Sequence, residues 1–255
     1  MLAFALAWRA LSMAHVIPPD GSRLRLRLYP RPNIDKLRRR RAAPTSLALF
    51  DTPPDDSNDS AAERLAARVV NFCLMNRNNS IILDRFPELG LRDWWLTSDC
   101  LFQTVWNLKI GRRADHAILN YEIFYFSEDP SWDAENEVIH NAKKLFEDLP
   151  VKVQVRNQAR VHLWFPEKFG IGYPPLTTAG EGILRFPASS QMVGIKRTGN
   201  DFIDIYAPFG LGDLWEMVVR PNRALPLSDQ YEEKTTNWHS RWPTLNVYSW
   251  SGRTK

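Results

Sequence analysis

The chain has few of the residues that stabilise small secreted folds or bind structural zinc. Only two of its 255 residues are cysteines, Cys73 and Cys100, and neither stands in a CxxC or CxxH pair. This scarcity excludes a disulfide framework and argues against a zinc site. The simplest interpretation is two reduced, packed thiols in a cytosolic protein, so we expect a cytoplasmic location.

Long apolar runs and internal repeats are also missing. No apolar stretch is long enough to cross a bilayer, and the apolar segment 1–14 is short and interrupted by Arg9. With 44% hydrophobic and 24% charged residues, the composition is that of an ordinary globular protein. The length fits one large domain or two small ones and is ample for a sizeable core.

A net positive charge is missing outside the N-terminal segment. The whole chain carries a formal net charge of +4, but residues 1–45 hold nine Arg and one Lys against two Asp, a net charge of +8. The rest of the chain holds 23 basic and 27 acidic residues, a net charge of −4. The basic pI therefore belongs to the N-terminal segment and gives little support for nucleic-acid binding by the remainder.

Residues 1–59 are predicted to be a basic, disordered extension and linker, and residues 60–250 the folded domain. Three interpretations of segment 1–45 remain open. Its Arg-rich, acid-poor composition is typical of organelle transit peptides, which gives an organelle as the alternative location. The Arg–Leu alternation over 23–28 and the basic run 38–41 also fit a disordered arm, the only part for which we expect nucleic-acid contact. The third interpretation is an upstream start codon chosen in error.

Helix and strand patterns alternate along the folded region. Ser60 followed by Glu63 is a capping-box start, and helical spacing of apolar residues follows it. Helices are predicted at 60–76, 101–110, 138–149, 178–185, 211–219 and 230–243. Strands are predicted at 118–126, 151–155 and 161–165, with a hairpin of 193–196 and 202–207 across the turn 198–201. This order predicts an α/β or α+β fold with a small mixed sheet.

Two polar side chains share one face of the first of these strands. Residues two apart on a strand point to the same side, so Asn120 and Glu122 are expected to lie together, roughly 7 Å apart. Gln154 faces away from the valines on a strand that could be a neighbour. Ser98 and Asp99 begin a helix directly after an apolar stretch, and the free N–H groups of a helix start suit a phosphate.

Four sequence blocks, taken in order, resemble one family. They are residues 95–106 (WLTSDCLFQTVW), 119–126 (LNYEIFYF), 155–162 (VRNQARVH) and 207–214 (APFGLGDL). They look like the successive blocks of a bacterial and fungal nucleotidyltransferase-like family that has been described as a domain of unknown function. The Asn-Gln-Ala-Arg-x-His block is highly distinctive. Through the wider polymerase-β-like nucleotidyltransferase superfamily, the resemblance implies a minimal αβ fold, a small mixed sheet flanked by helices.

The resemblance implies a metal-dependent site. In the superfamily a glycine–serine helix start holds the nucleotide phosphates, and carboxylates on two adjacent strands bind divalent metal. Carried over to this sequence, the phosphate position falls on Ser98 and Asp99. The catalytic and metal-binding positions fall on Asn120, Glu122 and Gln154. Mg²⁺ is then the implied cofactor and a nucleoside triphosphate the implied partner, while the acceptor stays open.

Most of the carried-over positions depart from the family pattern. Asp99 stands where the family usually has glycine, Asn120 where it has the first strand aspartate, and Gln154 where we match the third carboxylate. Glu122 keeps the charge of the second aspartate, and Asp213 is retained in the last block. A site with one formal charge in place of three should hold Mg²⁺ weakly. The added acid should also repel phosphate by roughly 1–4 kcal/mol at about 4 Å.

The distinctive block holds further candidates. Arg156 and Arg160 suit bidentate contacts with nucleotide phosphates, although each could instead form an ion pair within the protein. Asn157, Gln158 and His162 belong to the same family motif. For Asn157, Arg160 and His162, a substrate-binding role and a buried polar network remain equally open. His162 has no visible partner that would make it a general base.

Three functional hypotheses follow. The first is an atypical metal-dependent nucleotidyltransferase that transfers a nucleotidyl group to an unknown acceptor, with activity weakened by the altered metal positions. The second is a non-catalytic member that binds a nucleotide, another small ligand or a protein partner. The third is a nucleic-acid-associated protein that uses its basic N-terminal segment.

Overall fold

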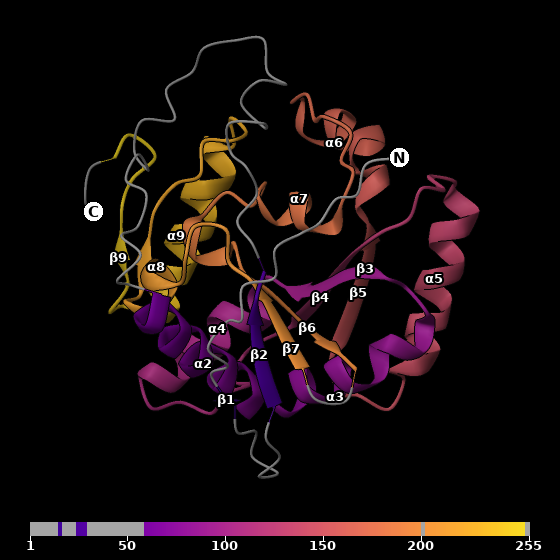
Figure 1. The fold of residues 1–255 in the computed structure, drawn as a ribbon. Coiled ribbons are helices and arrows are strands. Elements are labelled where there is room, and N and C mark those ends of the chain that lie inside the picture. Colours follow the sequence, from indigo (N-terminus) through magenta and orange to yellow (C-terminus); the bar gives the residue numbers. More distant parts are fainter. Residues whose placement is uncertain (1–14, 17–23, 30–58, 200–201, 253–255) are drawn as a thin grey trace, which may run out of the picture.

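A computed structural model describes residues 15–16, 24–29, 59–199 and 202–252. In this described part a seven-stranded mixed sheet has the order β1-β2-β7-β6-β3-β4-β5 (Figure 1). Its strands are β1 (His15–Val16), β2 (Leu24–Leu28), β3 (Asp93–Thr97), β4 (Asn120–Phe126), β5 (Lys152–Asn157), β6 (Gly194–Thr198) and β7 (Phe202–Tyr206). β8 (Val218–Val219) and β9 (Asn246–Val247) form a small separate sheet. The predicted α/β class with a mixed sheet is confirmed.

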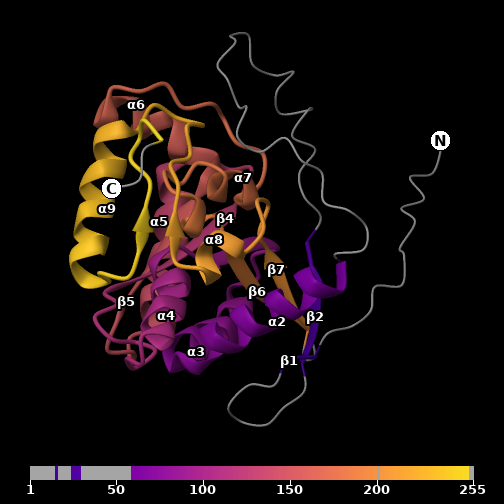
Figure 2. The same cartoon turned by 90° about the vertical axis from the view of Figure 1, so that its left-hand side faces the viewer.

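Helices cover both faces of the sheet. They are α2 (Asp59–Met75), α3 (Arg77–Arg85), α4 (Asp99–Lys109), α5 (Trp132–Leu145), α6 (Val161–Phe169), α7 (Ala179–Ile183), α8 (Gly212–Trp215) and α9 (Ser228–Arg241). α2 and α4 pack together against one face, and α7 covers the other (Figures 1 and 2). Among the described helices, none combines the length and the apolar character that a bilayer crossing requires.

The alternation of β4 separates the main core from a polar face. Tyr121, Ile123 and Tyr125 are buried in the core between the sheet and helices α2 and α4. Asn120 and Glu122 point to the opposite face and stay partly exposed. The prediction that these two polar side chains share one face of the strand is therefore confirmed, and that face is the one covered by α7.

Part of the predicted N-terminal extension belongs to the sheet. β2 pairs in parallel with β7, and Leu26 is buried in the core. Arg27 Nε lies 2.6 Å from Oδ1 of Asp204 on β7. The Arg–Leu alternation that suggested a basic arm is thus the alternation of a strand, with leucine inward and arginine paired to an acid. Of the predicted extension 1–59, the structure also describes β1, Tyr29 and Asp59, and the remainder lies outside the described residues. Residues 200–201 of the predicted turn 198–201 lie outside them as well.

Residues 161–165 form a helix, not the predicted strand. The Asn157 side chain accepts a hydrogen bond from the Ala159 N–H and so caps the short 3₁₀ turn η3 (Gln158–Arg160) that leads into α6. Val161 and Phe165, four residues apart, are both buried in a separate hydrophobic cluster. A five-residue apolar run fits a strand and a helix equally well, and the cap and the packing decided for the helix.

Other predicted boundaries differ as well, and the helix predicted at 138–149 runs as α5 from Trp132 to Leu145. The helix predicted at 211–219 is the short α8, because Met217 has a positive φ of 56° and the residues after it pair with β9. The polar residues after Met75 were expected to end the first helix, and they also begin a second helix, α3. There Asn76 accepts from the Asn78 N–H, and Asn79 Nδ2 donates to the Cys73 and Cys100 carbonyls. These amides are buried and bind α3 to α2 and α4.

Candidate functional site

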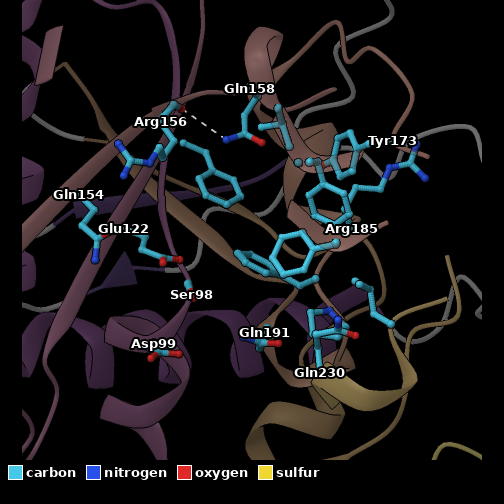
Figure 3. A pocket seen from close by; sticks show the side chains of 18 of the residues that line it. Ser98, Asp99, Glu122, Gln154, Arg156, Gln158, Tyr173, Arg185, Gln191 and Gln230 are labelled. Atoms are coloured by element: carbon cyan, nitrogen blue, oxygen red, sulfur yellow. Dashed lines mark hydrogen bonds between the residues drawn. The ribbon is translucent and has the colours of Figure 1, made fainter. Parts of the chain in front are cut away.

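A cavity of about 360 Å³ opens on the α7 side of the sheet. Its walls come from the start of α4, from β4 and β5, from α6 and the loop after it, from α7, from the 3₁₀ turn η4 (Ser189–Gln191) and from α9. Figure 3 shows Ser98, Asp99, Glu122 and Gln154 on one side of the cavity and Tyr173 and Arg185 on the other. Asn120 also lines it. The fold therefore brings together all five residues that were carried over to the phosphate and metal positions.

The junction between β3 and α4 is strained at Ser98. This residue is buried and has φ 67° and ψ −143°, a conformation that is almost restricted to glycine. From the sequence, the family glycine was assigned to position 99. The residue whose backbone has a conformation typical of glycine is Ser98, one position earlier. Thr97 Oγ1 holds the junction by donating to the Val193 carbonyl at 2.6 Å. Strain of this kind persists where surrounding structure enforces it, which is common at binding sites.

Two carboxylates, not one, lie at this end of the cavity. Burial raises the pKa of Glu122, and the charge of nearby Asp99 raises it further, while a hydrogen bond with Ser98 and the charges of Lys234 and Arg156 act in the opposite direction. Burial also raises the pKa of Asp99, and the Lys234 charge opposes this shift first. The two acids therefore repel each other, and the cation from α9 partly compensates both.

The other two metal positions are occupied by amides that bind each other. β4 and β5 are parallel neighbours, and their register places Gln154 beside Glu122. The Gln154 amide nitrogen donates to Oδ1 of Asn120 at 2.9 Å. The Asn120 oxygen therefore already accepts a hydrogen bond, and Gln154 turns its N–H group, not its oxygen, toward Asn120.

This donor set does not fit the metal pair that the family usually uses. A pair of divalent ions needs several carboxylate oxygens with open coordination positions. Within the described ranges, no group of three or more His, Cys, Asp or Glu side chains lies together in a way that could hold a metal ion. At the expected position, two amides face each other and a lysine lies close to the two acids.

The distinctive sequence block is divided between the cavity and a structural network. Arg156 and Gln158 line the cavity. Asn157 does not, because its Oδ1 accepts from the Ser127 N–H at 3.1 Å and its Nδ2 donates to the Ser127 and Asp129 carbonyls. These bonds fasten the end of β5 to the segment that follows β4. Of the two roles left open for Asn157, the structure supports membership of a buried polar network.

Arg160 also lies in that network and not at the cavity. Its Nε lies 2.8 Å from Oε2 of Glu135, both side chains are almost fully buried, and a further N–H donates to the Pro130 carbonyl. The other oxygen of Glu135 accepts from the backbone N–H of Asn157 at 2.9 Å. Of the two roles considered for Arg160, the structure therefore shows the ion pair within the protein, which joins η3 to α5.

His162 and Asp213 do not line the cavity either. His162 is half-buried on α6, and its Nδ1 has no hydrogen-bond partner in the described part of the chain. Asp213 accepts from Ser189 Oγ at 2.7 Å and from Arg220 Nε at 3.2 Å. It thereby holds η4 against the segment around β8. Its part in the family motif is consistent with this structural role.

Sequence reasoning missed the residues that close the cavity from the second half of the chain. Gln230 and Lys234 lie one turn apart on α9, and both face the cavity. Aromatic side chains from α6 and its following loop form another wall; they are Trp164, Phe165, Phe169 and Tyr173. The density of aromatic residues between 164 and 173 was a signal that could have indicated a binding wall.

The fold and the site together define a class of protein. The structure is similar to one described as "The NMR structure of the protein reveals a CCA-adding enzyme head domain", with a TM-score of 0.57 and 23% sequence identity. The similarity covers 71% of this chain and 95% of that chain, and at this identity it shows a shared fold. No curated protein matches the chain. Residues 84–247 match the family model described as Nucleotidyltransferase, and the chain belongs to that family.

Proposed function

We propose that this nucleotidyltransferase-family protein binds a nucleoside triphosphate in the cavity without requiring divalent metal, and that its nucleotidyl transfer is weakened or lost. The hydrogen bond between Gln154 and Asn120 carries the proposal, because it joins two neutral amides at the expected metal-binding positions. The family and the cavity support nucleotide binding, and the chemistry of the metal positions argues against efficient transfer.

The end of the cavity at the start of α4 suits the phosphates. The helix has eleven residues, and its N-terminus offers the positive end of the helix dipole. Two cationic side chains whose charges act on Glu122, Arg156 and Lys234, line the cavity together with the two carboxylates. Because the pKa values of both carboxylates are raised, the repulsion of a phosphate is smaller than two full negative charges would produce.

Lys234 supplies positive charge where a metal ion would otherwise be needed. It lines the same cavity as Asp99 and Glu122, and its charge opposes the rise in the pKa of both acids. A lysine in this position neutralises carboxylate charge and remains a point-charge partner for phosphate. Binding of the triphosphate then depends on α9 being in place and does not depend on added metal.

Calorimetric titration of the full chain with each of the four nucleoside triphosphates tests the proposal. We expect binding of at least one of them, with the same affinity in EDTA and in excess Mg²⁺. Lys234→Met should weaken it by roughly ten- to a hundredfold, because a hydrogen bond to a charged group contributes about 1.5–3 kcal/mol. Lys144→Met, at an exposed position on α5, is the matched control and should change nothing. Binding that appears only with Mg²⁺ contradicts metal independence.

The weakened transfer is tested separately. The wild-type chain and the Asn120→Asp/Gln154→Glu variant are incubated with a labelled triphosphate, Mg²⁺ and candidate acceptors, including the protein itself. We expect less labelled product from the wild-type chain than from the variant. Equal or faster labelling by the wild-type chain would show that amides at these positions do not limit the reaction.

A further inference from the structure

Beyond Asp99 and Glu122, the cavity has a second, aromatic end. It begins at Phe124, which follows Glu122 on the same face of β4 and stacks on Phe186 with ring centroids 5.3 Å apart, and it includes Phe165 and Tyr173, whose ring centroids lie 4.6 Å apart. Aromatic faces offer stacking surfaces to a flat heterocycle and are tolerant of its identity. A triphosphate gains nothing from such walls, so this end suits another part of a ligand.

Two buried glutamine side chains line the same cavity. Gln158 is buried and lies so close to α7 that a Cβ on Gly182 would come 2.1 Å from its Oε1. Its Nε2 donates to the Arg156 carbonyl at 3.4 Å (Figure 3). The glycine therefore makes the room in which this amide sits at the cavity wall.

Gln191 is the more informative of the two amides. Its side chain is only 2% exposed and lines the cavity, and its Oε1 has no hydrogen-bond partner in the described part of the chain (Figure 3). A buried acceptor without a donor is costly and is rare in native proteins. An N–H group on a ligand in the cavity would satisfy it.

We infer that this aromatic end is a nucleobase subsite in which Gln191 accepts a hydrogen bond from an N–H of the base. The inference rests on the proposed nucleotide binding and extends it from the phosphates to the base. The base stacks on the aromatic wall, and Gln158 borders it with a second fixed amide. All four bases carry an N–H donor at a different place on the ring, so Gln191 contributes to the choice among bases through the position of that donor.

The test compares nucleoside triphosphates, free nucleosides and inorganic tripolyphosphate by calorimetry in EDTA, with three forms of the full chain. Wild type should bind the preferred triphosphate more tightly than tripolyphosphate. Gln191→Met keeps the length of the side chain but removes its acceptor, so it should lose about tenfold in affinity for that triphosphate and none for tripolyphosphate. Ser190→Ala is the matched control, because the Ser190 hydroxyl is also buried without a hydrogen-bond partner among the described residues but does not line the cavity.

Thermal unfolding of the same variants separates binding from structure. Gln191→Met should unfold at the same or a higher temperature than wild type, because it removes an unsatisfied buried acceptor. Unchanged binding by Gln191→Met, or equal affinities for triphosphate and tripolyphosphate, overturns the base subsite and leaves phosphate binding standing. If free nucleosides bind and tripolyphosphate does not, the base subsite is supported and the proposed phosphate binding at the start of α4 is contradicted. No binding of any probe overturns both.

Discussion

Restoring carboxylates at the two amide positions should make the stability of this protein depend on Mg²⁺. In Asn120→Asp/Gln154→Glu, a hydrogen bond of 2.9 Å is replaced by two like charges beside Glu122. At about 3 Å, two unit charges repel by roughly 1–5 kcal/mol for effective dielectrics of about 80 to 20. The lost hydrogen bond adds about 1 kcal/mol. In a chain of this size the sum of roughly 2–6 kcal/mol corresponds to a fall in Tm of roughly 4–24 °C.

Thermal unfolding in EDTA and in Mg²⁺ measures this effect. We expect the variant to melt below wild type in EDTA and to recover with Mg²⁺, whereas wild type is insensitive to the metal. In EDTA, the difference in Tm between wild type and the variant should shrink as pH falls, because one of the two new carboxylates then takes up a proton and the repulsion between them ends. Asn136→Asp/Asn141→Asp adds the same number of charges at exposed positions on α5 and should change Tm little. A double variant that ignores Mg²⁺ would refute the assignment of residues 120, 122 and 154 to one site.

Three further predictions concern the groups around the cavity. Burial and the charge of Asp99 raise the folded-state pKa of Glu122, so the native state loses stability as pH rises from the unfolded to the folded pKa. Glu122→Gln should therefore raise Tm at neutral pH and have little effect in acid, and a lower Tm at neutral pH would contradict this cause. Arg160→Ala leaves Glu135 buried and unpaired and should cost about 3–5 kcal/mol in urea unfolding, with unchanged nucleotide affinity in the folded protein. A loss of affinity without a loss of stability would instead return Arg160 to the binding site. Ser98→Gly relieves a positive φ and should be about 1 kcal/mol more stable than Ser98→Ala, which lacks the same hydroxyl but keeps the strain. Equal stabilities of these two variants would show that the junction is not strained.

The sequence alone was sufficient wherever local periodicity matched the final environment. The alternation in β4 predicted that Asn120 and Glu122 share a face, because successive side chains of a strand point to opposite sides. The helix predicted at 230–243 and the hairpin predicted from 193–196 and 202–207 are also present, as α9 and as the antiparallel pair of β6 with β7. The four sequence blocks also predicted the family, since their order and residues do not depend on knowing the contacts.

Other features were decided by contacts between distant parts of the chain. Residues 24–28 form a strand because β7, which is far away in sequence, offers both a hydrogen-bonding edge and Asp204 as a partner for Arg27. Residues 161–165 form a helix because Asn157 caps the turn before it and a separate cluster buries Val161 and Phe165. Local pattern carried no information about either set of partners.

The cavity shows the same division. The sequence determined which polar residues stand on β4, β5 and the start of α4, and it determined that amides replace the expected acids. Only the tertiary structure brought Lys234 of α9 and Gln191 of η4 to the cavity that the two carboxylates line. Periodicity encodes which face of an element is buried, whereas the set of side chains that share one cavity depends on how elements from distant parts of the chain cross.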